Sequence, residues 1–170
     1  LVGDTCDNCP FESNATQSDA NGDVQGDVCD LDDGIIYIRF SDPQFVRWQE
    51  EQGFDGWNVY RGSLDALIST GVYTQEYGAS PLSGPACGLV EPFWQDLTTP
   101  EPGQVAFYLT TGTSSDSESG LGSSSTGDRP NDNPCIAPGS SSRRPPNSVG
   151  APNLGGVAGY VPRVETRHWG

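Results

Sequence analysis

The chain has 170 residues, a formal net charge of −15 and an apolar fraction of 34%. This length suits one or two small domains, and the low apolar fraction argues against a single large core. The acidic excess disfavours nucleic acid and anionic membrane surfaces as partners, because both are polyanions. No apolar run reaches the ~18 residues of a membrane span.

Residues 3–33 form an acidic segment that carries three of the five cysteines. Oxygen-bearing side chains recur there with the spacing D-x-N-x-D-x-x-x-D-x-x-D: Asp19, Asn21, Asp23, Asp27 and Asp30. Calcium takes about six to eight oxygen ligands, and the carbonyl of Gln25 falls at the seventh position, where calcium loops donate a main-chain oxygen. The sixth position is Val24, although such loops usually have a glycine there for the sharp turn. The spacing predicts a calcium loop; high-salt adaptation also favours acidic, lysine-free chains, but it would spread the acids evenly.

The same segment reads C-D-N-C-P at residues 6–10 and G-D-V-C-D at residues 26–30, with Asn14 and Gln17 between them. These motifs resemble the thrombospondin type 3 repeat, whose repeats have almost no apolar core and wrap around calcium ions. The resemblance implies calcium ligands at Asp19, Asn21, Asp23, Gln25, Asp27 and Asp30, and weaker candidates for a second ion at Asp7, Asn8 and Asn14. Asp4 and Asp7 look like the end of an earlier loop. The alternative is a solvated acidic linker.

The resemblance also implies a disulfide between Cys9 and Cys29. Cys87 and Cys135 are then the natural second pair, and Cys6 is left over. In the repeat family the partner of Cys6 lies in a preceding repeat; otherwise Cys6 is free or bonds another subunit. Disulfides predict an extracellular protein, and a start without methionine suggests part of a longer precursor.

From Gly34 onward, short apolar runs alternate with turn residues, which predicts an all-β unit. Strands are expected at residues 35–40, 44–49, 57–61, 71–75, 93–97, 103–113 and, weakly, 117–124, with loop at 78–88. Ser63 is expected to cap a short helical turn through Ile68. The strongest strand pattern is that of 103–113, where Val105, Phe107 and Leu109 alternate with Ala106, Tyr108 and Thr110.

Three groups of residues in this unit resemble a fibronectin type III-like domain: Val46-Arg47-Trp48, residues 57–62 (WNVYRG), and Leu97 followed by Pro102-Gly103 and Phe107-Tyr108-Leu109. The resemblance covers about residues 34–135 and implies an immunoglobulin-like β-sandwich. In such a domain Trp48 and Trp57 are core residues rather than ligand-binding ones. The fold class is therefore predicted to be mainly β: a calcium-wrapped repeat (1–33), a fibronectin type III-like sandwich (34–135) and an extended C-terminal arm (136–170).

The arm is rich in proline, glycine and serine, and has no core of its own. Such a segment becomes ordered only by lying on something else. Residues 157–161 are expected either to add to the sheet edge of another copy or to strap across their own domain.

The residues that enzymes need are missing from this sequence. The one histidine, His168, lies in the low-complexity arm, and a chain without lysine has neither a phosphate-binding P-loop nor a Schiff base. Cys6-x-x-Cys9 lacks two further zinc ligands. The sequence predicts no enzyme.

Three functions remain open. The first is an extracellular, calcium-binding structural or adhesive protein that binds other copies of itself or surface proteins, in a fibre or filament joined through the arm. The second is a non-catalytic module of a secreted hydrolase that binds carbohydrate or cell wall through Trp94 or Trp169. The third is an acidic subunit of a surface complex with no ligand beyond calcium.

Overall fold

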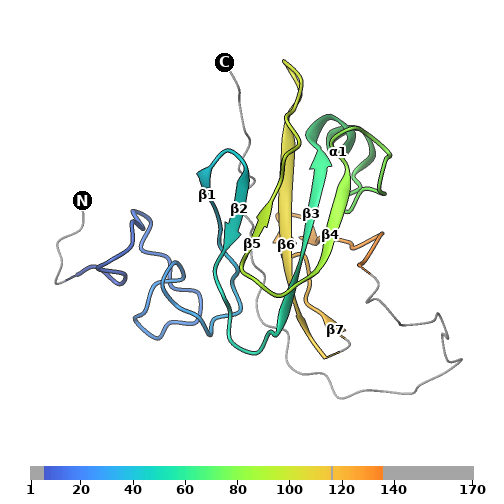
Figure 1. Cartoon of the computed structure of the whole chain (residues 1–170). Coiled ribbons are helices and arrows are strands. Elements are labelled where there is room, and N and C mark those ends of the chain that lie inside the picture. The colour runs from blue at the N-terminus through green and yellow to red at the C-terminus, as the bar shows by residue number, and fades with distance from the viewer. Residues whose placement is uncertain (1–5, 116, 136–170) are drawn as a thin grey trace, which may run out of the picture.

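The computed structural model describes residues 6–115 and 117–135. Within them the chain is mainly β, with one short helix (Figure 1). The elements are β1 (Ile38–Asp42), β2 (Phe45–Trp48), β3 (Gly56–Ser63), α1 (Leu64–Thr70), β4 (Gly84–Leu89), β5 (Phe93–Gln95), β6 (Ala106–Ser114), β7 (Ser117–Glu118), β8 (Ser123–Ser124) and β9 (Gly127–Asp128). The mainly-β prediction is confirmed. The predicted arm, Trp169 and Asp4 lie outside the described residues.

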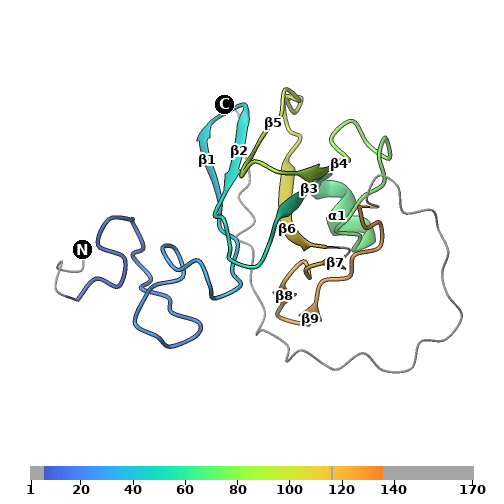
Figure 2. The same cartoon turned by 60° about the horizontal axis from the view of Figure 1, so that its bottom comes forward.

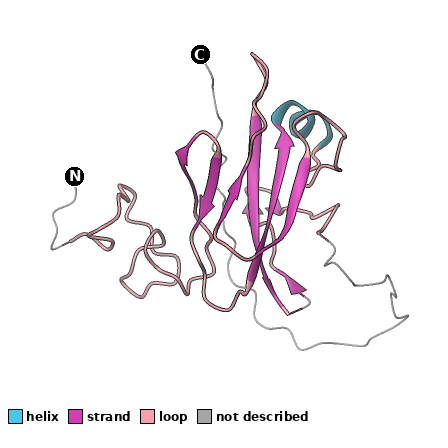
Figure 3. Cartoon of the chain, in the orientation of Figure 1, coloured by secondary structure: helices cyan, strands magenta, loops and turns pink. Residues whose placement is uncertain are grey.

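The strands form two main sheets (Figure 3). One has the order β1-β2-β5 and the other the order β4-β3-β6-β7, while β8 and β9 form a separate pair. A hydrophobic cluster joins the two main sheets: it contains Val46 and Trp48 of β2, Trp57 and Val59 of β3, and Tyr108 of β6. The rings of Trp48 and Trp57 lie 6.3 Å apart, and both side chains are buried, as expected for core residues.

The central strands β3 and β6 are buried on both faces. Phe107 and Leu109 of β6 form a second cluster with Tyr60 of β3 and Leu121, and Leu67 of α1 packs against it. The alternation expected along β6 is therefore present, but both sets of side chains lie in a core. Phe107 and Leu109 face one cluster, whereas Ala106 and Tyr108 face the other.

A buried ion pair connects β3 to the segment after β5. Arg61 forms an ion pair with Asp96, and the hydroxyl of Tyr108 donates to the second carboxylate oxygen at 2.7 Å. Burial alone would raise the pKa of Asp96, but the hydrogen bonds from Tyr108 and Arg61 outweigh it and lower the pKa. The carboxylate is therefore held in its charged form inside the domain.

The helix α1 begins and ends where local signals place it. The Ser63 side chain accepts from the backbone N–H of Ala66, and Gly71 ends the helix at φ 75° with its N–H donating to Leu67. The expected capping by Ser63 is confirmed, and the helix continues two residues past Ile68, to Thr70.

Three expected elements are wrong. Residues 71–75 contain no strand, because the side chain of Gln75 pairs with the backbone of Ser63 and Asn133 bonds Thr74. The expected loop at 78–88 ends at β4, a strand that exists through its pairing with β3. The single strand expected at 117–124 is two short strands, which pair with β6 and β9 respectively.

Residues 6–33 contain neither helix nor strand and lie to one side of the two main sheets, nearest the β1–β2 hairpin (Figures 1 and 2). The one buried apolar side chain in this segment is that of Cys9. A segment without an apolar core depends on other interactions for its fold. No helix among the described residues has the length and apolar character needed to cross a membrane.

Candidate metal centre

Both expected disulfides are present. Cys9 and Cys29 are bonded across 20 positions within the acidic segment, and Cys87 and Cys135 are bonded across 48 positions within the β unit. Cys6 is a free, exposed thiol in the described part of the chain. The Cys9–Cys29 bond closes a loop that contains five of the six predicted loop ligands: Asp19, Asn21, Asp23, Gln25 and Asp27. The sixth, Asp30, directly follows Cys29.

The side chain of Asp19 organises the first half of this loop. One carboxylate oxygen accepts from the backbone N–H of Gly22 at 2.7 Å, and the other accepts from the N–H of Val24 at 3.0 Å. Asp23 repeats the arrangement by accepting from the N–H of Gln25 at 2.8 Å. These bonds turn the chain tightly through residues 19–25.

Val24 occupies the position where a calcium loop usually has glycine, and it adopts the backbone conformation of one. Its φ is +83°, in the left-handed region that β-branched residues rarely adopt. The residue is 79% exposed, so packing compensates little for the conformation. The loop therefore keeps the sharp turn despite the unfavourable residue, with the bond to Asp19 holding it there.

A carboxylate from the middle of the loop approaches two that follow Cys29. One oxygen from each of Asp23, Asp30 and Asp32 lies within 4.8 Å of the other two. Asp32 was not among the predicted ligands, although it follows Asp30 by two residues, as alternate ligands in such a loop do. A hydrogen bond and the negative charge from Asp30 raise the pKa of Asp32 above its ordinary value. Three carboxylates this close repel one another unless a cation or protons lie between them.

The other predicted loop ligands lie around this group. The side-chain amide of Asn21 donates to Asp30 at 3.1 Å, and the side-chain amide of Gln25 donates to the carbonyl of Cys29 at 2.7 Å. Asp27 is buried, and one of its oxygens accepts from the N–H of Ala20 at 2.6 Å. Thus Asp23 and Asp30 approach one another, while Asp19 and Asp27 each bind backbone amides.

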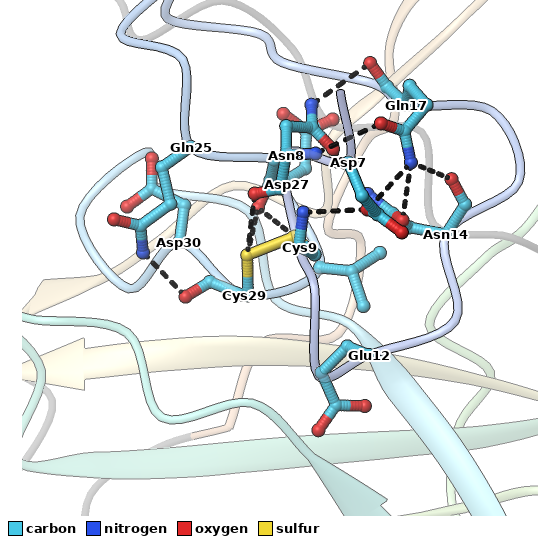
Figure 4. The surroundings of a disulfide bond; sticks show 12 residues. Asp7, Asn8, Cys9, Glu12, Asn14, Gln17, Gln25, Asp27, Cys29 and Asp30 are labelled. Atoms are coloured by element: carbon cyan, nitrogen blue, oxygen red, sulfur yellow. Dashed lines mark hydrogen bonds between the residues drawn. A yellow bond between two sulfur atoms is a disulfide. The ribbon is translucent and has the colours of Figure 1, made fainter. Parts of the chain in front are cut away.

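The weaker candidates form a separate network on the other side of the disulfide from Gln25 and Asp30 (Figure 4). The Gln17 amide donates to Asp7 at 3.0 Å and to the side-chain oxygen of Asn14 at 2.6 Å, and Asn14 in turn donates to Asn8. The hydrogen bond from Gln17 lowers the pKa of Asp7. In this arrangement oxygens of Asp7, Asn8 and Asn14 accept hydrogen bonds from side-chain amides, so hydrogen bonds among these side chains hold the region together.

Residues missed by sequence reasoning lie where the acidic segment meets the β unit. Asp33, Gln49 and Glu51 are all buried there. Burial raises the pKa of Glu51 to about 7 and that of Asp33 to about 6, and the neighbouring carboxylates add to both shifts. Gln49 directly follows β2, and its side-chain amide donates to the backbone of Asp27 and Asp30, which holds it in the interior. No local pattern distinguishes these residues from exposed ones.

Comparisons with known protein families, curated proteins and solved structures find no match to this chain. The assignment of a role therefore depends on the geometry of the described residues.

Proposed function

We propose that this chain is an extracellular, calcium-binding structural or adhesive module. The observation that carries the proposal is the convergence of Asp23, Asp30 and Asp32 in a segment that lacks an apolar core. Hard oxygen ligands at this spacing suit calcium, and a bound ion supplies folding free energy that apolar burial does not supply here. Calcium thus acts as a structural cross-link in a repeat of the thrombospondin type 3 kind.

The charge balance of the segment supports this role. Among the described residues, the ion pairs are Arg39 with Glu12 and Arg61 with Asp96. Within this same part of the chain, none of the three converging carboxylates is paired with an arginine, and the sequence has no lysine. An external cation is therefore the counter-charge that we propose for these carboxylates at neutral pH.

The β unit suits a structural domain of the fibronectin type III kind. Two antiparallel sheets that share a core, with connections that pass from one sheet to the other, are typical of a β-sandwich. Trp94 packs against this core, with its ring 6.5 Å from Tyr108 and Arg61 over its face at 5.6 Å. This half-buried ring favours the structural role over carbohydrate binding, which needs an exposed aromatic surface. Extracellular location agrees with the two disulfides.

The proposal extends to the arm. Residues 136–170 join copies of the chain into a fibre, and deletion of these residues is expected to leave soluble monomers that retain calcium binding. Assembly that persists after the deletion, measured by analytical ultracentrifugation, would assign the joint to another part of the chain.

Calcium titration of the full chain by calorimetry tests the central claim. A loop variant, Asp19→Asn with Asp23→Asn, is expected to bind at least one calcium ion fewer than wild type. A matched control, Asp55→Asn with Asp132→Asn, removes the same charge from exposed positions outside the segment and is expected to bind calcium as wild type does. Equal calcium binding by wild type and the loop variant would refute a metal site in this loop.

Chelation gives a second test. It is expected to loosen residues 6–33 and to leave the β unit folded. A calorimetric scan that does not change when a chelator is added would contradict the proposal.

A further inference from the structure

Three polar side chains are buried where the acidic segment joins the β unit, and we call them the junction group: Asp33, Gln49 and Glu51. Their exposed fractions are 5%, 8% and 3%. Asp33 ends the acidic segment, whereas Gln49 and Glu51 follow β2. The group therefore belongs to both parts of the chain.

The two carboxylates of the junction group accept hydrogen bonds from successive backbone amides. Asp33 accepts from the N–H of Ile35 at 2.7 Å, and Glu51 accepts from the N–H of Gly34 at 3.0 Å. Each carboxylate uses one oxygen for this bond. The other oxygen of each, Oδ2 of Asp33 and Oε1 of Glu51, is buried and has no hydrogen-bond partner among residues 6–115 and 117–135.

Gln49 adds a third buried oxygen that lacks a hydrogen-bond donor among the described residues. Its side-chain N–H groups donate to the carbonyls of Asp27 and Asp30, which fixes the amide against the acidic segment. Its Oε1 is buried and, within the same described ranges, also has no hydrogen-bond partner. The junction group thus presents three buried acceptor oxygens, and a buried oxygen without a partner costs free energy.

Within the described part of the chain, no positive side chain balances the two carboxylates. Arg39 forms its ion pair with Glu12 and donates to the carbonyl of Val28 at 3.2 Å. Arg47, four positions before Glu51, lies over the rings of Phe45 and Phe93. Neither Asp33 nor Glu51 is in an ion pair among the described residues. Adjacent buried carboxylates without a counter-charge are strongly unfavourable, and a proton shared between them would still leave the oxygen of Gln49 unpaired.

We infer that the junction group is a second cation site, which holds a calcium-like divalent ion through Asp33 Oδ2, Glu51 Oε1 and Gln49 Oε1. Two carboxylates neutralise the double charge, and water completes the shell of about six to eight oxygens. This ion joins the acidic segment to the β unit, because its ligands come from both. The inference does not depend on a metal in the loop of Asp19 to Asp30, since none of its ligands belongs to that loop.

The number of calcium ions per chain, counted by native mass spectrometry with calcium alone as the ligand, tests this site. Glu51→Gln keeps an oxygen for the Gly34 amide and removes one charge, so it is expected to bind one ion fewer than wild type. Asp33→Asn is expected to lose the same ion. The matched control is Glu50→Gln, which removes an equal charge from an exposed neighbour and is expected to leave the count unchanged.

A count that Glu51→Gln and Asp33→Asn leave unchanged would overturn the site and would indicate carboxylic acids held by protons. The loop variant Asp19→Asn with Asp23→Asn separates the two claims. Loss of an ion in the loop variant alone supports the proposed function and refutes the junction site. Loss of an ion in the junction variants alone supports the junction site and refutes a metal ion in the loop.

A measurement that does not depend on the folding of the junction variants uses amide hydrogen exchange. In the loop variant, calcium is expected to slow exchange at the amides of Gly34 and Ile35, which donate to the junction carboxylates. Exchange at these two amides that calcium does not change would also overturn the inference.

Discussion

Removal of the Cys9–Cys29 disulfide tests whether residues 6–33 depend on cross-links rather than on apolar burial. The perturbation is Cys9→Ala together with Cys29→Ala. The bond spans 20 positions, and a closed loop of this length lowers the entropy of the unfolded chain by the equivalent of about 3 kcal/mol. Apolar packing cannot offset this loss, because Cys9 provides the one buried apolar side chain of the segment.

Calcium binding is coupled to folding in this proposal, so the loss becomes a shift in calcium dependence. If one ion binds as the segment folds, about 3 kcal/mol corresponds to an increase of about 100-fold in the calcium concentration at half-protection. Hydrogen exchange monitored by mass spectrometry over residues 6–33, across a calcium titration, measures this midpoint. The same data report on β3 and β6, whose protection is expected to persist.

The matched control removes the other disulfide through Cys87→Ala with Cys135→Ala. That bond spans 48 positions within the β unit, so its loss is expected to destabilise this unit by about 4 kcal/mol and to leave the calcium midpoint of residues 6–33 in place. An unchanged midpoint in the Cys9–Cys29 variant would refute the reasoning, because it would mean that the acidic segment folds without its cross-link.

Three other changes have defined outcomes. Val24→Gly removes the strain of a β-branched residue at φ +83°, roughly 1–2 kcal/mol, so it is expected to tighten calcium binding several-fold in a calorimetric titration. The control Val24→Ala keeps the Cβ and is expected to tighten binding less. Weaker calcium binding by the glycine variant would contradict the loop assignment. Arg61→Leu leaves the buried carboxylate of Asp96 unpaired and is expected to lower the free energy of unfolding, measured by urea denaturation, by about 3–5 kcal/mol. The control Arg47→Leu, at an exposed cation–π site, is expected to lower it by less than about 1 kcal/mol. Equal losses in the two variants would contradict a stabilising role for the ion pair. Burial and a hydrogen bond to Glu118 raise the pKa of Tyr60 to about 12. The contribution of this group to the free energy of unfolding, about 2–3 kcal/mol, is therefore complete below pH ~10 and disappears as pH rises towards 12. Tyr60→Phe is expected to remove this part of the pH dependence of stability, and a variant that retains it would assign the effect to another group.

Sequence patterns predicted the parts of this fold that depend on neighbouring residues. The capping serine at 63 marks the start of α1, and the apolar alternation within 103–113 marks β6. In the candidate metal centre, the spacing of the acids placed Asp23 and Asp30 in one loop. These features can be predicted because one short stretch of chain contains the whole signal.

Tertiary packing determined the rest. The segment of β4 reads GPACGL, which has no strand pattern, and it becomes a strand because the edge of β3 is available to pair with it. Residues 71–75 have a strand-like pattern but form side-chain hydrogen bonds with distant residues in place of pairing with a strand. Pairing depends on what lies alongside a segment, and the segment itself does not encode that.

The sequence by itself determined that the first 33 residues are acidic, cross-linked by cysteine and poor in apolar side chains. Only the tertiary structure decided which of the acids meet: Asp32 lies with Asp23 and Asp30, and Asp33 lies with Glu51, 18 positions later in the chain. The physical reason is that the free energy of a carboxylate depends on its solvent and on nearby charges. Both are set by chain segments that are distant in the sequence.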